Sequence, residues 1–243
     1  MATHDPRTTV NDIIKDRRYA WNEAEERKWH PDIQEPEFWA MVHDVWDYTV
    51  LGTAALYNIY TSVDYVVKAH IPGDFVECGV FMGGSVMFTA ELCKRRNLAD
   101  RSIYALDTFR GFVRRSALDV DFNGQEYGFP VDNATSQRPM AEANIRSVGW
   151  RPDLVNIVEG DVRDTCPILP TNRIAILRLD TDTYDTTMVE LETLYPRVSA
   201  RGVIIADDYG WGRGQRTAVD EYFADSPPCI VRIDRYTSVF VKL

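Results

Sequence analysis

The feature that most restricts the fold of this sequence is a regular alternation of short apolar runs with segments of helical periodicity. The apolar runs are Asp74–Val80, Ser102–Leu106, Leu154–Glu159, Arg173–Leu179 and Val203–Ala206. The helical segments are Ser85–Arg96, Pro139–Gly149, Thr186–Tyr195 and Arg216–Ala224. Strands that alternate with helices at this spacing are joined by right-handed crossovers. The pattern therefore predicts a mostly parallel sheet that is covered by helices on both faces.

The last two apolar runs break this pattern. Cys229–Asp234 and Thr237–Lys242 are separated only by Arg235 and Tyr236. A parallel crossover needs about a dozen residues or more, so one of the two runs should be antiparallel to its neighbours. An open parallel sheet that ends in an antiparallel hairpin is typical of class I methyltransferases. We therefore predict an α/β fold with a Rossmann-like sheet of this class.

Residues 1–70 have a different texture, with helical patterns at Glu37–Val50 and Ala54–Ala69 and no clear strand. We predict a helical cap over residues 1–70 and a catalytic domain over residues 71–243, with the change at Ile71-Pro72-Gly73. Most of the tryptophans in the cap are expected to pack in its core, and a minority to line a pocket for a ring-shaped substrate. These residues are Trp21, Trp29, Trp39 and Trp46.

Charge and cysteine usage exclude several classes of function. The 27 basic and 37 acidic residues give a net charge of −10, which argues against binding to nucleic acid or to an anionic membrane. No apolar run approaches the ~20 residues of a membrane helix, and the first residues lack the apolar core of a signal peptide. We expect a cytoplasmic protein whose four widely spaced cysteines are buried thiols. All four histidines lie within residues 1–70, which disfavours nucleophilic hydrolysis.

A glycine-rich turn follows the first predicted strand. Glu77 ends the strand, Gly79 and Gly83 allow the backbone to approach a ligand, and Ser85 begins the next helix. The spacing is neither that of a dinucleotide-binding fingerprint nor that of a phosphate-binding loop. An acidic residue before the turn suits a ligand with a cationic or hydroxyl-rich part. A plain turn between strand and helix remains the alternative.

Acidic residues also end the second and third strands. Asp107 is placed to bind both hydroxyls of a ribose, and Asp161 could contact an adenine amino group. Each could instead cap the helix that follows. Together with Glu77 they describe an adenosine site without phosphates.

Three further carboxylates follow the fourth and fifth strands, at Asp180, Asp207 and Asp208. These strands should be neighbours about 4.8 Å apart, which brings the three side chains together. Carboxylates so close repel one another unless a cation lies between them, and ligation by oxygen alone favours Mg²⁺, with Ca²⁺ or Mn²⁺ as alternatives. The other interpretation is that these acids cap separate helices, a role for which Asp182 or Asp185 is also a candidate.

The same acids fit a rival family less well. Asp180-Thr181-Asp182-Thr183 resembles the nucleophile motif of haloacid-dehalogenase-like phosphatases, which also need a lysine between the two acidic motifs. There is no lysine from Thr181 to Val241, and three strands precede the motif. A glycosyltransferase interpretation fails because nothing nearby would hold a nucleotide diphosphate.

The motifs at the strand ends resemble those of the macrocin O-methyltransferase family. The matching segments are Phe75–Ser85, Leu106–Phe112, Leu177–Thr187, Leu194–Ser199 and Ile205–Gly210, with a weaker match near Leu51–Asn58. The resemblance implies an enzyme that depends on S-adenosylmethionine and Mg²⁺ and methylates sugar hydroxyls of natural products. It also implies a homodimer or higher homo-oligomer assembled through the N-terminal helices.

The resemblance assigns roles to individual residues. Glu77 and the turn from Gly79 to Ser85 would hold the methionine end of the cofactor, Asp107 the ribose and Asp161 the adenine. The metal ligands would be Asp180, Asp207 and Asp208, and Asp180 would also be the general base. The complete set expected to bind the cofactor is Glu77, Gly79, Val80, Gly83, Ser85, Asp107, Thr108, Gly111, Phe112, Asp161, Val162 and Asp180.

Two other functions remain open. A catechol-type methyltransferase would use the same cofactor and metal on an aromatic vicinal diol, and the tryptophans of the cap permit such an acceptor. A non-catalytic binding protein would keep the glycine-rich turn but has little reason to keep three converging carboxylates.

Overall fold

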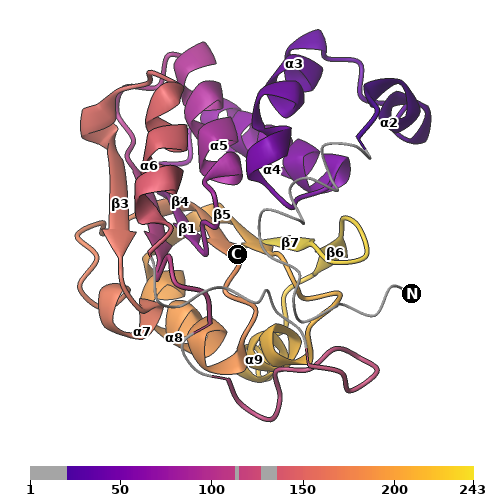
Figure 1. Cartoon of the computed structure of the whole chain (residues 1–243). Helices are drawn as coiled ribbons and strands as arrows, with labels where there is room; N and C mark the ends of the chain where they lie inside the picture. The colour runs from indigo at the N-terminus through magenta and orange to yellow at the C-terminus, as the bar shows by residue number, and fades with distance from the viewer. Residues whose placement is uncertain (1–20, 113–114, 127–135) are drawn as a thin grey trace.

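The computed structural model describes residues 21–112, 115–126 and 136–243. Within these ranges one sheet has the strand order β3-β2-β1-β4-β5-β7-β6 (Figure 1). Strands β1 to β5 run parallel, and β7 runs antiparallel to β5 and β6. This confirms the predicted class of fold, including the antiparallel hairpin at the end. The strands are β1 (Asp74–Cys78), β2 (Ile103–Asp107), β3 (Val155–Glu159), β4 (Ile174–Leu179), β5 (Val198–Ala206), β6 (Val231–Arg232) and β7 (Ser238–Val241).

Helices cover both faces of the sheet because its central strands are apolar on both sides. In β4, Ile176 packs into one buried cluster and Leu177 into the other, as the two-residue period of a strand requires. The first cluster includes side chains from α3 (Pro36–Val45), α4 (Thr53–Lys68), α5 (Gly84–Arg95) and α6 (Arg138–Ser147). The second includes side chains from α7 (Val162–Thr165), α8 (Tyr184–Leu194) and α9 (Arg213–Tyr222).

The N-terminal segment shares its core with the sheet. Its two predicted helices are present as α3, which is extended by a 3₁₀ turn over Trp46–Tyr48, and as α4; the short α2 (Glu23–Trp29) precedes them. The ring centroids of Phe38 in α3 and Phe88 in α5 are 5.8 Å apart. Arg96, which follows α5, forms ion pairs with Glu37 at 2.6 Å and Asp64 at 2.8 Å. The segment therefore packs directly on the sheet layer, and the domain boundary at residue 71 stays a prediction.

Several local expectations differ from the structure. Strand β5 begins at Val198, five residues before the predicted run, and the single-turn helix α7 was not predicted. Cys229 is exposed, whereas the other three cysteines are buried as expected. Trp39 is buried but the side chain of Trp29 is 80% exposed, so the tryptophans do not share one environment. None of the helices in the described ranges combines the length and the apolar character that a membrane span requires.

A segment from the long loop after β2 contacts the first turns of α8 and α9. The buried Asp119 accepts a hydrogen bond at 2.8 Å from the backbone N–H of Tyr184, the first residue of α8. The Arg213 N–H, at the start of α9, donates to the Val120 carbonyl at 2.9 Å. The N-cap residue of α8 is Thr183, not Asp182 or Asp185, and Asp185 lies in the first turn of the helix. Residues 113–114 and 127–135 of the predicted loop lie outside the described residues.

Candidate active site

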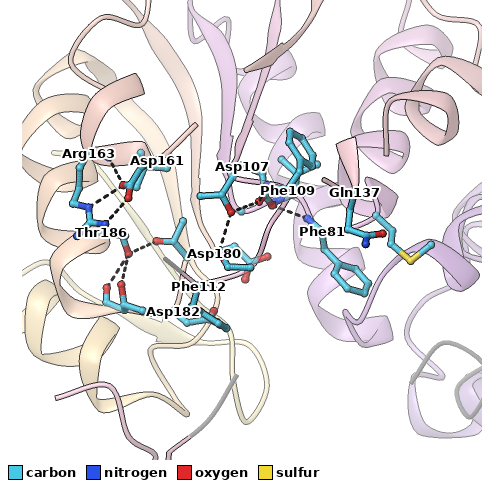
Figure 2. A pocket seen from close by; sticks show the side chains of 18 of the residues that line it. Phe81, Asp107, Phe109, Phe112, Gln137, Asp161, Arg163, Asp180, Asp182 and Thr186 are labelled. Carbon is cyan, nitrogen blue, oxygen red and sulfur yellow. Dashed lines mark hydrogen bonds and ion pairs between the residues drawn. The ribbon is translucent and has the colours of Figure 1, made fainter. Parts of the chain in front are cut away.

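A pocket opens at the carboxyl ends of the central strands (Figure 2). Parallel strands end at the same edge of a sheet, so residues far apart in the sequence meet there. Nine of the residues predicted to bind the cofactor line this pocket: Gly79, Val80, Asp107, Thr108, Gly111, Phe112, Asp161, Val162 and Asp180. The predicted adenosine site and the first of the predicted metal ligands therefore share one cavity.

Asp107 is fixed at the rim of this pocket by the backbone of the glycine-rich turn. Its Oδ2 atom accepts hydrogen bonds from the N–H groups of Val80 at 2.6 Å and Phe81 at 2.9 Å. Its Oδ1 atom accepts from the Phe109 N–H at 2.7 Å. A carboxylate offers about four lone-pair sites, so beside these three bonds and a long contact from Thr108 Oγ1 at 3.5 Å it can accept about one further hydrogen bond from a ligand. The turn and the end of β2 thus hold Asp107 in one orientation before any ligand binds.

The other predicted residues of this turn lie behind the pocket and are not among its lining residues. The side chain of Glu77 is buried, and its Oε1 atom accepts hydrogen bonds from Ser85 Oγ and, at 3.0 Å, from Arg178 Nη1. Gly83 has a φ of +91°, and a Cβ atom there would lie 2.7 Å from Ile145 Cγ1 of α6. Glu77, Gly83 and Ser85 therefore lie outside the lining of this pocket, and their contacts with the cofactor stay predictions.

Asp161 combines the two roles that the sequence left open. It lines the pocket and is also the N-cap residue of α7, where it accepts a hydrogen bond at 3.0 Å from the Arg163 N–H. The guanidinium of Arg163 also donates to it, with Nε at 2.9 Å from Oδ1. The carboxylate is thus held at the wall formed by the end of β3 (Figure 2).

The three acids after β4 and β5 converge. Carboxylate oxygens of Asp180, Asp207 and Asp208 lie within 4.8 Å of one another. Burial raises the pKa of Asp180 and of Asp208 well above the usual range. Neighbouring acids add to the shift, chiefly Asp207 for Asp180 and Asp182 for Asp208, while the nearby Arg178 opposes it. Among the described residues these are the acids grouped closely enough to share a cation.

Two charged residues of this region were missed from the sequence. Asp182 lines the pocket, and burial raises its pKa to about 7, while a hydrogen bond with Asp208 opposes the shift. Arg178 is 3% exposed and lies among Glu77, Asp180 and Asp207. A charged residue is seldom fully buried without partners, so an arginine inside the apolar run of β4 was a signal that could have been used.

A buried carboxyl group of α8 contacts residues that line the pocket. Glu190 is fully buried, and its Oε1 atom accepts a hydrogen bond at 2.8 Å from Thr181 Oγ1. Thr181 Oγ1 also lies 2.7 Å from Thr186 Oγ1, within hydrogen-bond distance, and both threonines line the pocket. Burial is the main cause that raises the pKa of Glu190 well above 4.5.

This shift predicts a pH-dependent stability. Above pH 4.5 Glu190 is ionised in the unfolded chain but still protonated in the folded state, where its pKa is raised. The free energy of unfolding therefore falls as the pH rises from 4.5 towards the pKa of the folded state. Relative to Glu190→Gln, the wild-type free energy of unfolding should fall by up to about 1.4 kcal/mol per pH unit between pH 5 and 7. Urea unfolding of both proteins measures this difference, with Glu192→Gln, an exposed residue of the same helix, as control. A difference that stays constant with pH would contradict the prediction.

Comparison with known proteins identifies the family. The sequence profile of the macrocin-O-methyltransferase (TylF) family matches residues 4–242. The chain belongs to the macrocin O-methyltransferase family. The resemblance stated from the motifs is therefore confirmed, and so is the enzyme class of O-methyltransferase.

Two relatives of this macrocin O-methyltransferase family member are themselves named as O-methyltransferases. It is 34% identical over 166 residues to mycinamicin III 3''-O-methyltransferase of Micromonospora griseorubida, a match that covers 67% of this chain and 65% of the relative. It is 32% identical over 196 residues to demethyldecarbamoylnovobiocin O-methyltransferase of Streptomyces niveus, covering 77% of this chain and 73% of the relative.

Solved structures agree with the fold. The O-methyltransferase NovP superposes with a TM-score of 0.67 at 29% identity, covering 80% of this chain and 82% of NovP. The calicheamicin methyltransferase CalS11 superposes with a TM-score of 0.70 over 99% of this chain and 98% of CalS11, at 18% identity. At that identity the second likeness concerns the fold alone.

Proposed function

We propose that this protein transfers a methyl group from S-adenosylmethionine to a hydroxyl of a sugar moiety on a glycosylated natural product, in antibiotic biosynthesis. The observation that carries the proposal is that Asp107, Asp161 and Asp180 line one cavity. An adenosine-type site thereby shares one pocket with Asp180, the member of the acid cluster that lines it. The named relatives, which methylate mycinamicin and novobiocin precursors, support the class of acceptor.

In this proposal the cofactor occupies the part of the pocket between the glycine-rich turn and Asp161. Asp107 would accept a hydrogen bond from a ribose hydroxyl, and Asp161 one from the adenine amino group. Gly79 lets the backbone approach the methionine end of the cofactor, because it has a φ of +90° and no side chain. Phe81, Phe109 and Phe112 supply apolar surface to the same cavity.

The acid cluster fits a divalent cation. Its donors are carboxylate oxygens, which Mg²⁺ prefers. Burial first, and then repulsion from neighbouring acids, raises the pKa values of Asp180 and Asp208, and a cation would offset that repulsion. We therefore propose that Asp180, Asp207 and Asp208 hold Mg²⁺. When bound, the ion would act as a Lewis acid towards the acceptor hydroxyls and lower their pKa.

Asp180 is the proposed general base, because it belongs to both the pocket and the acid cluster. It would accept the proton of the acceptor hydroxyl while the oxygen attacks the methyl carbon. The C–O bond forms as the C–S bond breaks, and the electron pair of that bond stays on sulfur to give S-adenosylhomocysteine. The walls of the pocket align the two reactants in line, which supplies much of the remaining rate.

Calorimetry and product detection test the proposal. S-adenosylmethionine is titrated into the protein with and without Mg²⁺, and S-adenosylhomocysteine is then measured over a panel of sugar-bearing antibiotic precursors and catechols. We expect cofactor binding and Mg²⁺-dependent turnover on a glycoside. Turnover on catechols alone would replace the acceptor class, and absence of cofactor binding in both conditions would refute the proposal.

We further propose that the enzyme works in the cytoplasm as a homodimer or larger assembly formed through its N-terminal helices. Trp29 at the end of α2 is the exposed large apolar residue of these helices at which such a contact can be tested. Light scattering of the wild type and of Trp29→Ser tests this, and we expect the variant to shift towards the monomer.

A further inference from the structure

A buried arginine contacts two of the proposed metal ligands. Arg178 Nη1 donates to Asp180 Oδ2 at 2.6 Å, and Arg178 Nη2 forms an ion pair with Asp207 Oδ1 at 2.9 Å. The arginine is on β4, and in the sheet it is paired with Glu77 on β1 and Ile205 on β5. The guanidinium thus engages one oxygen atom of each of two carboxylates.

Groups on other elements hold both the arginine and one aspartate in place. Glu77 Oε1 accepts a hydrogen bond from Arg178 Nη1 at 3.0 Å and is itself held by Ser85 Oγ. Asp207 Oδ1 accepts a second contact at 3.1 Å from Thr237 Oγ1, which follows β6. The Nη2 contact with Asp207 lacks hydrogen-bond geometry, so charge attraction dominates it. The arrangement is therefore fixed from β1, β4 and the hairpin end of the sheet.

This arrangement leaves one oxygen of each of the two aspartates that Arg178 does not engage. Within the described ranges no protein donor is bonded to Asp180 Oδ1 or to Asp207 Oδ2, whereas Oδ2 of Asp180 and Oδ1 of Asp207 are engaged by Arg178. Each aspartate can therefore offer one oxygen without breaking an ion pair. Mg²⁺ demands compact octahedral geometry, whereas Ca²⁺ takes six to eight oxygens and readily accepts two from one carboxylate.

We propose that Arg178 is a positioning residue that makes Asp180 and Asp207 one-oxygen ligands and thereby makes the site favour Mg²⁺ over Ca²⁺. The inference rests on the proposed function only in that the acid cluster binds a divalent cation. The planar guanidinium of Arg178 can contact two carboxylates at once, which the single ammonium group of a lysine cannot do with the same geometry. Its charge also offsets part of the repulsion among the acids.

Metal binding without acceptor tests the proposal. Dissociation constants for Mg²⁺ and Ca²⁺ are measured by calorimetry, and by competition with Mn²⁺ in electron paramagnetic resonance, for the wild type, Arg178→Lys and Arg178→Gln. We expect the ratio of the Ca²⁺ to the Mg²⁺ dissociation constant to fall at least about tenfold in both variants. Arg101→Lys is the matched control, because Arg101 is also buried but is not bonded to the acid cluster. Its Nη1 atom donates a hydrogen bond of 3.0 Å to the Gly73 carbonyl.

The variants separate geometry from charge. Arg178→Lys keeps the positive charge, so a wild-type ratio in that variant would overturn the proposal. If Arg178→Gln does not fold, Glu77→Gln provides the second variant, since it weakens the support behind the guanidinium, and we expect a smaller fall in the ratio. A wild-type protein that binds neither cation would also overturn the inference, whereas S-adenosylmethionine affinity, measured on the same samples, tests the cofactor site independently. Failure to methylate any glycoside would leave the measured ratio intact.

Discussion

Replacing Asp180 by asparagine should lower turnover by about a thousandfold or more while the cofactor still binds. General-base catalysis contributes about 10² to 10⁴ to a rate, and the substitution also removes one charge from the acid cluster. Asparagine has the size of aspartate, and its carbonyl oxygen can still accept the hydrogen bond from Arg178 Nη1. The pocket should therefore keep its shape. The measurement is the rate of S-adenosylhomocysteine formation together with the dissociation constant of S-adenosylmethionine.

The same substitution should leave the free energy of unfolding unchanged or raise it at neutral pH. Burial raises the pKa of Asp180 in the folded state, so the ionised side chain is better accommodated in the unfolded chain at pH 7. Asparagine removes that cost. A loss of activity with no loss of stability would separate a functional role from a structural one.

Asp185→Asn is the matched control for this experiment. Asp185 is in the first turn of α8, five residues after Asp180, and is not among the residues that line the pocket. Its removal should cost only the small interaction of an acid with a helix N-terminus, about 0.3 to 1 kcal/mol. If Asp180→Asn retained more than a tenth of wild-type turnover, the assignment of the general base would be wrong.

The convergence of the acids could be predicted because it depends only on topology. Once β4 and β5 are parallel neighbours, Asp180 and Asp207 must meet at one edge of the sheet. The orientation of individual side chains could not be predicted in the same way. Glu77 was expected at the strand end beside Asp107, yet the register pairs it with Ala105, two residues before Asp107, and its side chain bonds to Arg178.

Contacts between side chains of distant segments could not be predicted from the sequence. The pairing of Arg178 with Glu77 follows from the register of β1 and β4, which no pattern in either strand fixes. The hydrogen bond from the Tyr184 N–H to Asp119 joins residues 65 positions apart, and it depends on how the loop after β2 folds back onto α8. Local patterns report which face of an element is apolar, and they carry little information on which polar groups will meet across the fold.

Gly79→Ala should destabilise the fold by about 3 to 5 kcal/mol and abolish cofactor binding. A Cβ atom at Gly79 would lie 1.9 Å from the carbonyl oxygen of Asp180, and the φ of +90° is unfavourable for any residue with a side chain. The backbone after β1 or after β4 must then move. Either movement would displace the turn that binds Asp107 or the acid that we assign as the base. Thermal unfolding should show a midpoint lowered on the order of 10 °C.

Gly149→Ala separates the clash from the backbone strain. Gly149 also has a positive φ, of +68°, but nothing lies within 4 Å of the Cβ atom that alanine would add there. The same substitution should therefore cost only the strain of a left-handed residue, about 1 to 2 kcal/mol, and leave cofactor affinity unchanged. The difference in the free energy of unfolding between the two variants gives the cost of the clash between the backbone segments that follow β1 and β4. If both variants melted within about 2 °C of each other, this approach would not be what requires glycine at position 79.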